Sequence, residues 1–311
     1  MANQVSRTGM LDVNAAAVLI DKSIDAVFMR RDQTTGFVLQ PFFDKVSKDS
    51  GLTHVIQSAG SALPLPTLNE DTAALPYVAP TTGFRKTFQL LTYRSGIRVT
   101  RGILEADRFD RVGQMATGQL KAAMRKDEYM RAGVFNGAFS GTLGADGQYL
   151  CADSHPQENA DADTWDNLGT GTLTGPNLHA LRLLARRMTN DQGQPDQVEP
   201  QTLIVSPEKE QIALELTMLG RGKPDTNFNQ PNVLLPNFKV VVSPYLSSTT
   251  AYFIVGDRMG YDKGLLEIVL SDWSIADNRP ANADIMIDKR IRATKAWGFT
   301  TSRNVFGSSG T

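Results

Sequence analysis

The residues best suited to chemistry lie together in one short stretch, Cys151-Ala-Asp-Ser-His-Pro. His155 and the nearby Asp153 could form a base or ligand cluster beside a thiol. Cys-x-x-x-His alone, however, lacks the further pair of ligands that a zinc site needs, and a polar loop ending at a proline accounts for the same residues. His54 and His179 have no metal-ligand spacing around them. We therefore expect no catalytic, metal or cofactor-binding residue, and keep a soluble α+β hydrolase that uses His155 and Asp153 as an alternative.

The other candidate motifs are incomplete. Gly141-Thr-Leu-Gly-Ala-Asp-Gly lacks the Gly-Lys-Ser/Thr ending of a phosphate loop, so we expect a turn there. Ser154 and Ser206 have no Gly-x-Ser-x-Gly context for a nucleophile elbow. An acidic region comprises Asp146, Asp153, Asp161, Asp163 and Asp166. It has no Asp-x-Asp-x-Asp-Gly calcium loop, so we expect a solvated loop. The sequence thus predicts a protein that is not an enzyme and uses no cofactor.

Composition narrows the classes of partner. In 311 residues, 32 lysines and arginines balance 33 acidic residues, for a net charge of -1. A dedicated nucleic-acid binder normally shows a basic excess, whereas a shell that encloses DNA without gripping it needs none. The single cysteine, Cys151, rules out an internal disulfide. The apolar run at residues 15–20 is too short to span a membrane, and the polar start does not predict a secretory signal.

The most conspicuous predicted element is a long helix from Asp107 to Phe135. At about 1.5 Å per residue it would be roughly 40 Å long, which is long for a globular helix. Its apolar face follows i, i+3, i+4 spacing and comprises Phe109, Val112, Ala116, Leu120, Ala123, Met130 and Val134. Internal glycines each cost on the order of 1 kcal/mol against alanine, so the helix must recover stability from packing.

The same helix is rich in charge. Its cations are Arg108, Arg111, Lys121, Arg125, Lys126 and Arg131, and its acids are Asp107, Asp110, Asp127 and Glu128. Such a pattern is usually a solvated, salt-bridged face. The alternative is one wall of a surface that makes weak, nonspecific contact with packaged DNA.

An extended ribbon is predicted immediately before the helix, from Phe84 to Val99. Its apolar residues change from even to odd positions at Leu90-Leu91, which indicates a bulge or a strong twist, as in a free-standing two-stranded ribbon. Residues 44–83 are rich in Ser, Thr, Pro and Gly, and we expect a projecting arm rather than an internal loop. Neither the ribbon nor the helix can bury itself within one compact domain, so we expect a chain that acts by assembling.

The remaining segments predict a mixed fold. Helices are expected at residues 13–29, 177–188 and 207–219, and strands at 202–206, 238–243, 251–256, 264–270 and 283–300. Strands and helices follow one another without a regular βαβ rhythm, so the predicted fold class is α+β.

In order and spacing, these segments resemble the tailed-bacteriophage major capsid proteins of the Hong Kong 97-like fold. The resemblance rests on the ribbon, on Ser95-Gly-Ile-Arg-Val-Thr-Arg-Gly-Ile-Leu-Glu-Ala-Asp, on the long helix, and then on Gln201 to Ala213, Phe238 to Leu246, Ala251 to Asp257 and Ile285 to Arg303. The stretch from Asp146 to Pro156 is similar to the Mu-like major head subunit branch.

The resemblance implies an N-terminal arm (1–40), an extended β-hairpin loop (41–100), a peripheral domain with a spine helix (101–175), an axial domain with a mixed sheet (176–282), and a C-terminal strand that returns to the peripheral domain (283–311). It further implies hexamers and pentamers that form an icosahedral shell around double-stranded DNA in the virion, assembled in the host bacterial cytoplasm. The implied partners are other copies of the chain and the portal, scaffolding and decoration proteins, with no membrane.

Three further expectations come with the resemblance. Because the chain starts almost at the arm, any scaffolding is expected to be a separate protein. Lys45 and Lys48 lie in the loop, but no crosslink is expected, because no partner Asn or catalytic Glu is evident. The arm and the loop are expected to bury their apolar residues only after assembly; these are Phe42, Phe43, Leu63, Leu65 and Leu75.

Other functions remain open at this point. An encapsulin-type nanocompartment shell shares the implied fold and encloses enzymes in place of DNA. The hydrolase predicts a monomer or a small oligomer. A tail structural protein predicts tubes or rings, whereas a capsid protein predicts closed shells.

Overall fold

The structure is a computed structural model, and it describes residue 22 and residues 37–59, 82–106, 111–158, 164–190, 194–196, 198–218, 238–257, 264–277 and 285–310. The helix expected at 13–29, nearly all of the arm (1–40) and the helix start expected at Asp107 lie outside these residues. So do Leu63, Leu65 and Leu75. Within the described ranges, no helix has the length and hydropathy to cross a membrane.

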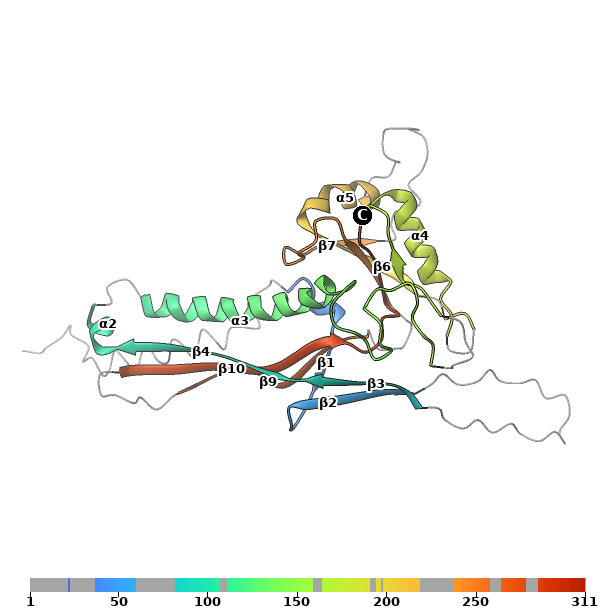
Figure 1. Ribbon diagram of the computed structural model, residues 1–311. Helices are drawn as coiled ribbons and strands as arrows, with labels where there is room; N and C mark the ends of the chain where they lie inside the picture. The colour runs from blue at the N-terminus through green and yellow to red at the C-terminus, as the bar shows by residue number, and fades with distance from the viewer. Residues whose placement is uncertain are drawn as a thin grey trace, which may run out of the picture. The chain divides into compact units, whose positions relative to one another are not determined.

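Helices and strands follow one another irregularly along the chain, which confirms the α+β class (Figure 1). The helices are η2 (Gln40–Phe42), α2 (Arg101–Ala106), α3 (Arg111–Asn136), α4 (Gly175–Arg186), η3 (Pro207–Lys209) and α5 (Glu210–Met218). The strands are β1 (Asp44–Ser47), β2 (Thr53–Ala59), β3 (Thr82–Gln89), β4 (Leu91–Thr100), β5 (Leu168–Gly169), β6 (Glu199–Val205), β7 (Lys239–Val242), β8 (Tyr252–Asp257), β9 (Leu265–Asp277), β10 (Ile285–Phe299) and β11 (Val305–Ser308). They form sheets of order β1-β9-β10-β4, β5-β11-β8-β6-β7 and β2-β3.

The chain divides into two compact units. The first unit comprises residues 1–36, 90–127 and 269–295, and the second comprises residues 37–89, 128–268 and 296–311. The division falls after Asp127 in α3, after Ile268 in β9 and after Lys295 in β10. Three single elements therefore contribute residues to both units, and the units are described separately below.

In the first unit, α3 packs on the ladder formed by β4 and β10. These strands are antiparallel, with Val99 opposite Ile287 and Ser95 opposite Ile291. Because side chains alternate along a strand, one face of the ladder collects the apolar residues. The buried core comprises Ile97, Val99, Ala116, Leu120, Ile287 and Ile291. Ala116 and Leu120 belong to the predicted apolar face of the helix, so this packing recovers stability that the helix glycines cost.

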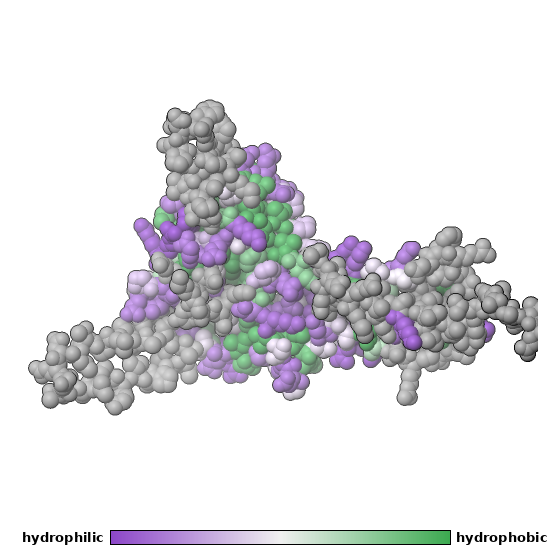
Figure 2. Space-filling model, turned by 180° about the vertical axis from the view of Figure 1, so that it is seen from behind, coloured by the Kyte–Doolittle hydropathy of each residue, from purple (hydrophilic) through white to green (hydrophobic). Residues whose placement is uncertain are grey.

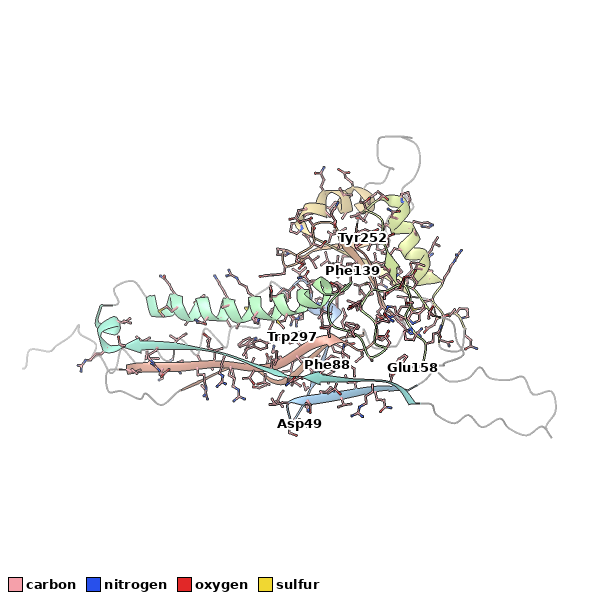
Figure 3. All side chains as sticks on the ribbon, in the orientation of Figure 1. Asp49, Phe88, Phe139, Glu158, Tyr252 and Trp297 are labelled. Atoms are coloured by element: carbon pink, nitrogen blue, oxygen red, sulfur yellow. The ribbon has the colours of Figure 1, made fainter. Side chains whose placement is uncertain are left out.

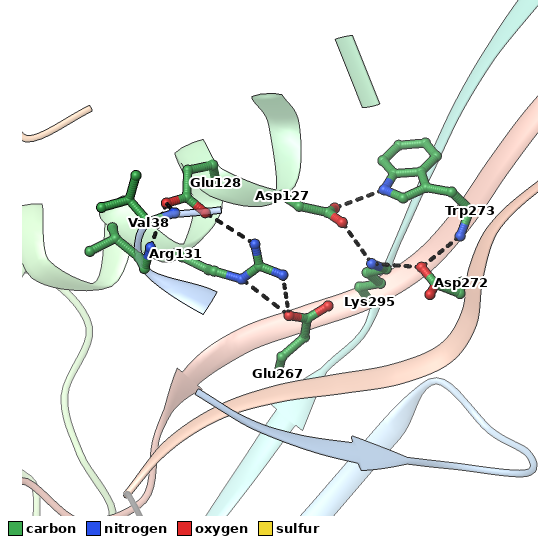
Figure 4. Close-up of polar contacts among 9 residues, drawn as sticks. Val38, Asp127, Glu128, Arg131, Glu267, Asp272, Trp273 and Lys295 are labelled. Atoms are coloured by element: carbon green, nitrogen blue, oxygen red, sulfur yellow. Dashed lines mark hydrogen bonds and ion pairs between the residues drawn. The ribbon is translucent and has the colours of Figure 1, made fainter. Parts of the chain in front are cut away.

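A buried lysine also links three elements of the first unit (Figure 4). Lys295 on β10 donates to Asp127 Oδ2 of α3 and to Asp272 Oδ1 of β9, both at 2.8 Å. Asp127 Oδ1 accepts a further hydrogen bond, at 2.8 Å, from Trp273 Nε1. Lys295 and Asp127 are almost fully buried. A buried charge is tolerated only when it is paired and hydrogen-bonded, so this network fixes how the helix meets the sheet.

In the second unit, the five-stranded sheet has an apolar core on each face. Tyr252 and Ile254 of β8 face one core, and Phe253 and Val255 face the other. Helices α4 and α5 cover the first face (Figure 1), contributing Leu178, Leu181, Ala185 and Ala213. The second face packs against Phe135, near the end of α3, and against other residues of that core. Burial on both faces explains the uninterrupted apolar runs in these strands, which are residues 203–205 of β6 and residues 252–255 of β8.

Most predicted elements are confirmed within a few residues. The helix expected at 177–188 is α4, the helix expected at 207–219 is η3 with α5, and the strands expected at 202–206, 238–243 and 251–256 are β6, β7 and β8. The expected change of face at Leu90-Leu91 is confirmed as a break at Leu90 between β3 and β4. β9 is longer than predicted, and α2, β1, β5 and β11 were missed. The expectation of a projecting arm is therefore wrong for residues 44–47, which form β1 of the four-stranded sheet.

The buried ion pair of the first unit gives a stability prediction. Lys295→Met leaves the Asp127 carboxylate buried with only part of its partners, so the free energy of unfolding should fall by about 3–5 kcal/mol. The matched control is Arg186→Met, which breaks an ion pair with Glu199 whose side chains are 45% and 47% exposed; it should cost under about 1 kcal/mol. Denaturant titration followed by circular dichroism measures both. Equal losses in the two variants would contradict the role given to Lys295.

Candidate assembly surface

The β2–β3 ribbon presents one polar face to solvent. The two strands are antiparallel, with Val55 opposite Thr87 and Gln57 opposite Arg85. The exposed face comprises Thr53, Val55, Gln57, Arg85, Thr87 and Gln89. Both strands are edges of a two-stranded sheet, and edge strands present backbone groups that can pair with another chain. This face therefore has the chemistry of a contact surface.

The opposite face of the ribbon packs against the body of its own unit (Figure 3). Lys86 donates to the carbonyl oxygens of Leu143 and Phe299 at 2.8 and 2.9 Å, and its ammonium lies 4.2 Å from the centre of the Phe299 ring. Phe88 is buried against Gly298, where an added Cβ would lie only 2.7 Å from the Phe88 ring. The predicted ribbon of residues 84–99 is two-stranded only as far as β3, because its second half is β4 of the four-stranded sheet. The expectation that the ribbon is free-standing is wrong for the described residues.

A carboxylate from the following loop holds the far end of the ribbon. Glu158 Oε1 accepts hydrogen bonds from the Phe84 backbone, at 3.3 Å, and from the Ser58 hydroxyl. Ser58 and Phe84 lie near the ends of β2 and β3 that lead into residues 60–81. The ribbon is thus attached to its own unit along β3, and its other face stays exposed.

Large apolar side chains are exposed on several elements of the two units. Each is at least one-third exposed; they are Leu52, Val55, Leu91, Ile103, Met115, Tyr129, Leu143 and Leu183. Figure 2 shows green apolar areas between purple polar ones on the face that it displays. Single exposed apolar residues are ordinary, and one of these, Val55, lies on the exposed face of the β2–β3 ribbon itself.

Two of the apolar residues that we expected to become buried only on assembly, Phe42 and Phe43, already pack within the single chain. Phe43 is buried within the second unit, in edge-to-face contact with Phe135 at 6.3 Å between ring centres. Phe42 is half-buried against the same core. The prediction that these two phenylalanines become buried only on assembly is therefore wrong for Phe43 and in part for Phe42.

The described end of the arm is fastened to α3 within the second unit (Figure 4). The backbone N–H groups of Val38 and Leu39 donate to Glu128 Oε1 at 2.9 and 2.7 Å. Arg131 binds Glu128 Oε2 at 3.1 Å and Glu267 Oε2 at 2.6 Å. Sequence reasoning placed Asp127, Glu128 and Arg131 on a solvated face, and that placement is wrong, because all three are buried. The i, i+3 spacing of Glu128 and Arg131 was the one feature of the sequence that indicated that these two side chains pair with each other.

The cations of α3 that face solvent in the described residues include Lys121 and Arg125. Lys126 is half-buried, with its ammonium 5.1 Å from the centre of the Tyr93 ring. The acids Asp127 and Glu128 are turned inward. Among the described residues of α3, burial therefore separates these acids from the cations, and the salt-bridged surface expected there is replaced by one that carries exposed cations.

His155 is buried in a structural network. It stacks on Trp165, with ring centres 4.2 Å apart, and its Nδ1 lies 2.6 Å from Asp146 Oδ2. Its Nε2 lies 3.0 Å from Oδ1 of Asn167. Asn167 Nδ2 in turn donates to the carbonyl oxygens of Leu150 and Val305. This side-chain amide joins three stretches of backbone, and the network explains the polar residues around Cys151.

The geometry does not assemble the chemistry suggested by the sequence. The carboxylate partner of His155 is Asp146, whereas Asp153 is exposed and accepts from the neighbouring Ser154 hydroxyl at 3.2 Å. Ser302 Oγ lies 3.3 Å from the same His155 Nδ1 that contacts Asp146. A catalytic triad needs serine and carboxylate on opposite ring nitrogens. The hydrolase pair of His155 and Asp153 is therefore not formed.

The other residues that the sequence offered as candidates for catalysis or metal binding also lie in surroundings that do not favour such chemistry. Burial raises the pKa of the Cys151 thiol, and the nearby Asp166 raises it further, so the reactive thiolate is disfavoured. Ser206 is buried and donates to the Thr249 carbonyl oxygen at 3.4 Å. His54 lies in β2, and His179 is exposed on α4. Across the ranges that the structure covers, no three His, Cys, Asp or Glu side chains gather in a way that could hold a metal ion.

The glycine-rich stretch is a turn, as predicted. Gly144 N donates to the Gln148 carbonyl oxygen at 2.6 Å, and Gly147 has a φ of 78°. Of the acidic region, Asp146 is mostly buried, which corrects the prediction of a solvated loop at that position. Burial raises the pKa of Asp166, and the backbone hydrogen bond from Leu168 opposes that shift. Asp161 and Asp163 lie outside the described residues.

Comparison with known proteins places these elements in a wider context. A family model described as phage capsid protein matches residues 84–304. No curated protein matches the chain in sequence. The virus-like particle from Pyrococcus furiosus is similar in structure, with a TM-score of 0.54 and 10% identity over 92% of this chain and 98% of that one.

Two phage structures are similar to a comparable degree. The capsid of the cyanophage P-SCSP1u has a TM-score of 0.56 and 12% identity, covering 86% of each chain. The procapsid of bacteriophage JBD30 has a TM-score of 0.52 and 12% identity, covering 94% of this chain and 75% of that one. At such identities the likeness concerns the fold.

The network around His155 predicts a structural role for that side chain. His155→Phe keeps an aromatic ring against Trp165 but loses the contacts to Asp146 and Asn167, so the free energy of unfolding should fall by about 1–3 kcal/mol. His179→Phe, on the exposed face of α4, is the control and should change stability by less than about 0.5 kcal/mol. Thermal and denaturant unfolding report both values. A His155→Phe variant as stable as the parent would contradict the structural role given to His155.

Lys86 predicts a pH dependence of stability. Burial lowers the pKa of Lys86 from 10.5 to about 8, although the charge of Asp146 acts in the opposite direction. Between pH 8 and 10.5 the unfolded chain therefore binds more protons at this residue than the folded chain does, and the folded state should gain stability as pH rises. The comparison is the unfolding free energy of the parent minus that of Lys86→Met, measured from pH 7 to pH 10.5. A difference that stays flat or falls across this range would contradict the lowered pKa.

Proposed function

The chain belongs to the phage capsid protein family, and from that premise we propose that copies of it join as hexamers and pentamers to close an icosahedral shell around double-stranded DNA. It is a capsid protein with the Hong Kong 97-like fold, and it builds the shell of the particle. The observation that carries the proposal is the family match over residues 84–304, which spans most of the ribbon strand β3, all of α3, and β5, β6, β7 and β8 of the five-stranded sheet.

The described elements support assembly from many identical copies. The outer face of β2–β3 is exposed and both its strands are edges. A head-to-tail contact of one surface with a different surface on the next copy closes into rings, as hexamers and pentamers require. A net charge of -1 limits repulsion among many copies. Ordering of loops and side chains at the contacts is stabilised in the assembled state by mass action.

The partners and the location follow from the same proposal. The shell belongs to a virion, forms in the cytoplasm of a host bacterium, and joins portal, scaffolding and decoration proteins. Contact with the enclosed DNA is weak and nonspecific, and the Mu-like branch remains a prediction. No lysine crosslink is proposed. Lys48, one of the two loop lysines considered for it, donates to the Thr53 carbonyl oxygen in its own chain.

The alternatives receive less support. The family match favours a phage shell over a nanocompartment. We propose that the chain is not an enzyme, in keeping with the buried position of His155 and its pairing with Asp146. A tail structural protein would form tubes or rings, which electron microscopy of the expressed chain distinguishes from closed shells.

Removal of β2 tests the role of the ribbon. Residues 50–81 can be replaced by a Gly-Ser linker of about ten residues. Because β2 runs antiparallel to β3, the linker must cover the length of β3, and its eight residues span roughly 26 Å at about 3.3 Å each. This replacement keeps β1, β3 and the Lys86 contacts. The parent chain should form closed shells in negative-stain micrographs, and the variant should give folded subunits, by circular dichroism, without stable shells.

A composition-matched control separates length from sequence. Replacement of residues 50–81 by a scrambled order of the same residues keeps composition and length but not the ribbon pairing, and it should fail in the same way. Stable closed shells from the shortened chain would show that the ribbon is not an assembly element.

A further inference from the structure

A cluster of exposed arginines lies on the β4–β10 sheet of the first unit, on the face opposite its apolar core. We call it the arginine ladder, and it comprises Arg94, Arg98, Arg290 and Arg292. All four are exposed, and each is an even-numbered position on a strand whose odd positions include the core residues Ile97, Val99, Ile287 and Ile291. Since side chains alternate across a sheet, the four guanidinium groups project from one face.

The register brings like charges together. Arg94 lies directly opposite Arg292, and Arg290 lies opposite Gly96, which separates Arg94 from Arg98 along β4. Like charges directly opposite each other destabilise a pair of strands. Only Arg98 has an acidic partner, Asp288 at 3.2 Å; within the described ranges, no ion pair is formed by Arg94, Arg290 or Arg292. The sheet therefore carries an electrostatic cost that an anionic partner would offset.

Gly96 leaves space at the centre of the ladder. A Cβ added there would have only the Lys289 carbonyl oxygen within reach, at 3.6 Å, which is ordinary contact. The backbone of Gly96 does not need a glycine for its φ, since it is not among the positive-φ positions. A side-chain carboxylate entering over Gly96 would have arginines on several sides, and a guanidinium binds a carboxylate through two parallel hydrogen bonds.

The chain itself supplies a matching acidic feature in its sequence. Between β2 and β3, residues 60–81 contain two charged side chains only, the adjacent acids Glu70 and Asp71. They fall at the middle of the segment, about ten residues from either strand. Eleven residues can extend over at most roughly 36–40 Å, which sets an upper limit on the distance from the ribbon at which the two acids could bind.

We propose that the arginine ladder binds Glu70 and Asp71 of a second copy of this chain. The inference rests on the proposed shell function and names the surface on which the segment between β2 and β3 docks. DNA phosphate is the other anion that the ladder would accept. The carboxylates are favoured because the chain as a whole has no basic excess and because Glu70 and Asp71 are the only charged residues in the sequence between β2 and β3.

Charge exchange tests the pairing. Arg94→Glu with Arg292→Glu, and separately Glu70→Arg with Asp71→Arg, should each lower the fraction of chain in closed shells by about tenfold at low salt, as expected for the loss of a few ion pairs. The four substitutions together should restore that fraction to within about twofold of the parent. Lys121→Glu with Arg125→Glu, exposed cations of α3, is the matched control and should leave assembly unchanged. Subunit folding is followed by circular dichroism.

A cysteine pair tests whether the contact joins two copies. The native Cys151 is buried, so Gly96→Cys with Asp71→Cys adds the two accessible thiols of interest to shells that keep the ladder intact. Mild oxidation should give covalent multimers on non-reducing gels, and either single variant should give none. A crosslink that leaves the chain monomeric would overturn the docking on a second copy, and so would the absence of any crosslink.

The outcomes separate the ladder from the shell function. If the parent forms no shells, the proposed function fails. If the parent forms shells but the exchanged charges do not restore assembly, the ladder proposal fails alone. Reversed arginines that leave shells closed but reduce nuclease-protected DNA would also overturn it, and would assign the ladder to DNA. If the reversed ladder does not fold, the cysteine pair decides the question.

Discussion

The described structure depends on the burial of two successive carboxylates of α3, Asp127 and Glu128. Neither can stay ionised in an apolar interior without partners, so each dictates what surrounds it. In the first unit Asp127 requires Lys295 and Trp273, which brings β10 and β9 to the helix. In the second unit Glu128 requires Arg131 and the backbone N–H groups of residues 38 and 39, which fastens the described end of the arm. The buried acids of α3 therefore hold neighbouring segments in place within each unit, as the apolar face of the helix does.

The ribbon shows how a contact element can be held and still present a free face. Its inner face is attached by Lys86, by the close approach of Phe88 to Gly298, and by Glu158. Its outer face carries small β-branched and polar side chains, which fit a pleated surface and are readily paired. Attachment along one face reduces the freedom that assembly would otherwise have to remove. A ribbon anchored in this way is better prepared for contact than a free-standing one.

Much of the fold could be predicted from local hydrophobic patterns, and most of the errors share a physical cause. Short apolar runs identified β6, β7 and β8, the 3.6-residue period identified α4, and the change of face at Leu90 marked the end of β3. β11 was missed because it has only four residues, ending in Gly307 and Ser308, and so shows neither alternation nor an apolar run of strand length. Arg131 was placed in solvent because charged residues usually lie there. His155 was paired with Asp153, two residues away, whereas its carboxylate is Asp146, nine residues away. Local patterns report local structure, and partners brought together by folding are invisible to them.

The distribution of charge also could not be predicted from the sequence, because a net charge near zero does not show which charged side chains are buried and which are exposed. The chain has nearly equal numbers of acids and bases, yet folding turns Asp127, Glu128 and Glu267 inward and leaves Lys121, Arg125 and the arginine ladder in contact with solvent. At physiological salt the Debye length is about 8 Å, so distant copies sense little of the net charge, and only patches that touch can discriminate. A near-neutral chain can therefore approach its own copies without repulsion and still choose the orientation in which they meet. Which acids are buried, rather than how many there are, determines the surface that a neighbouring copy meets.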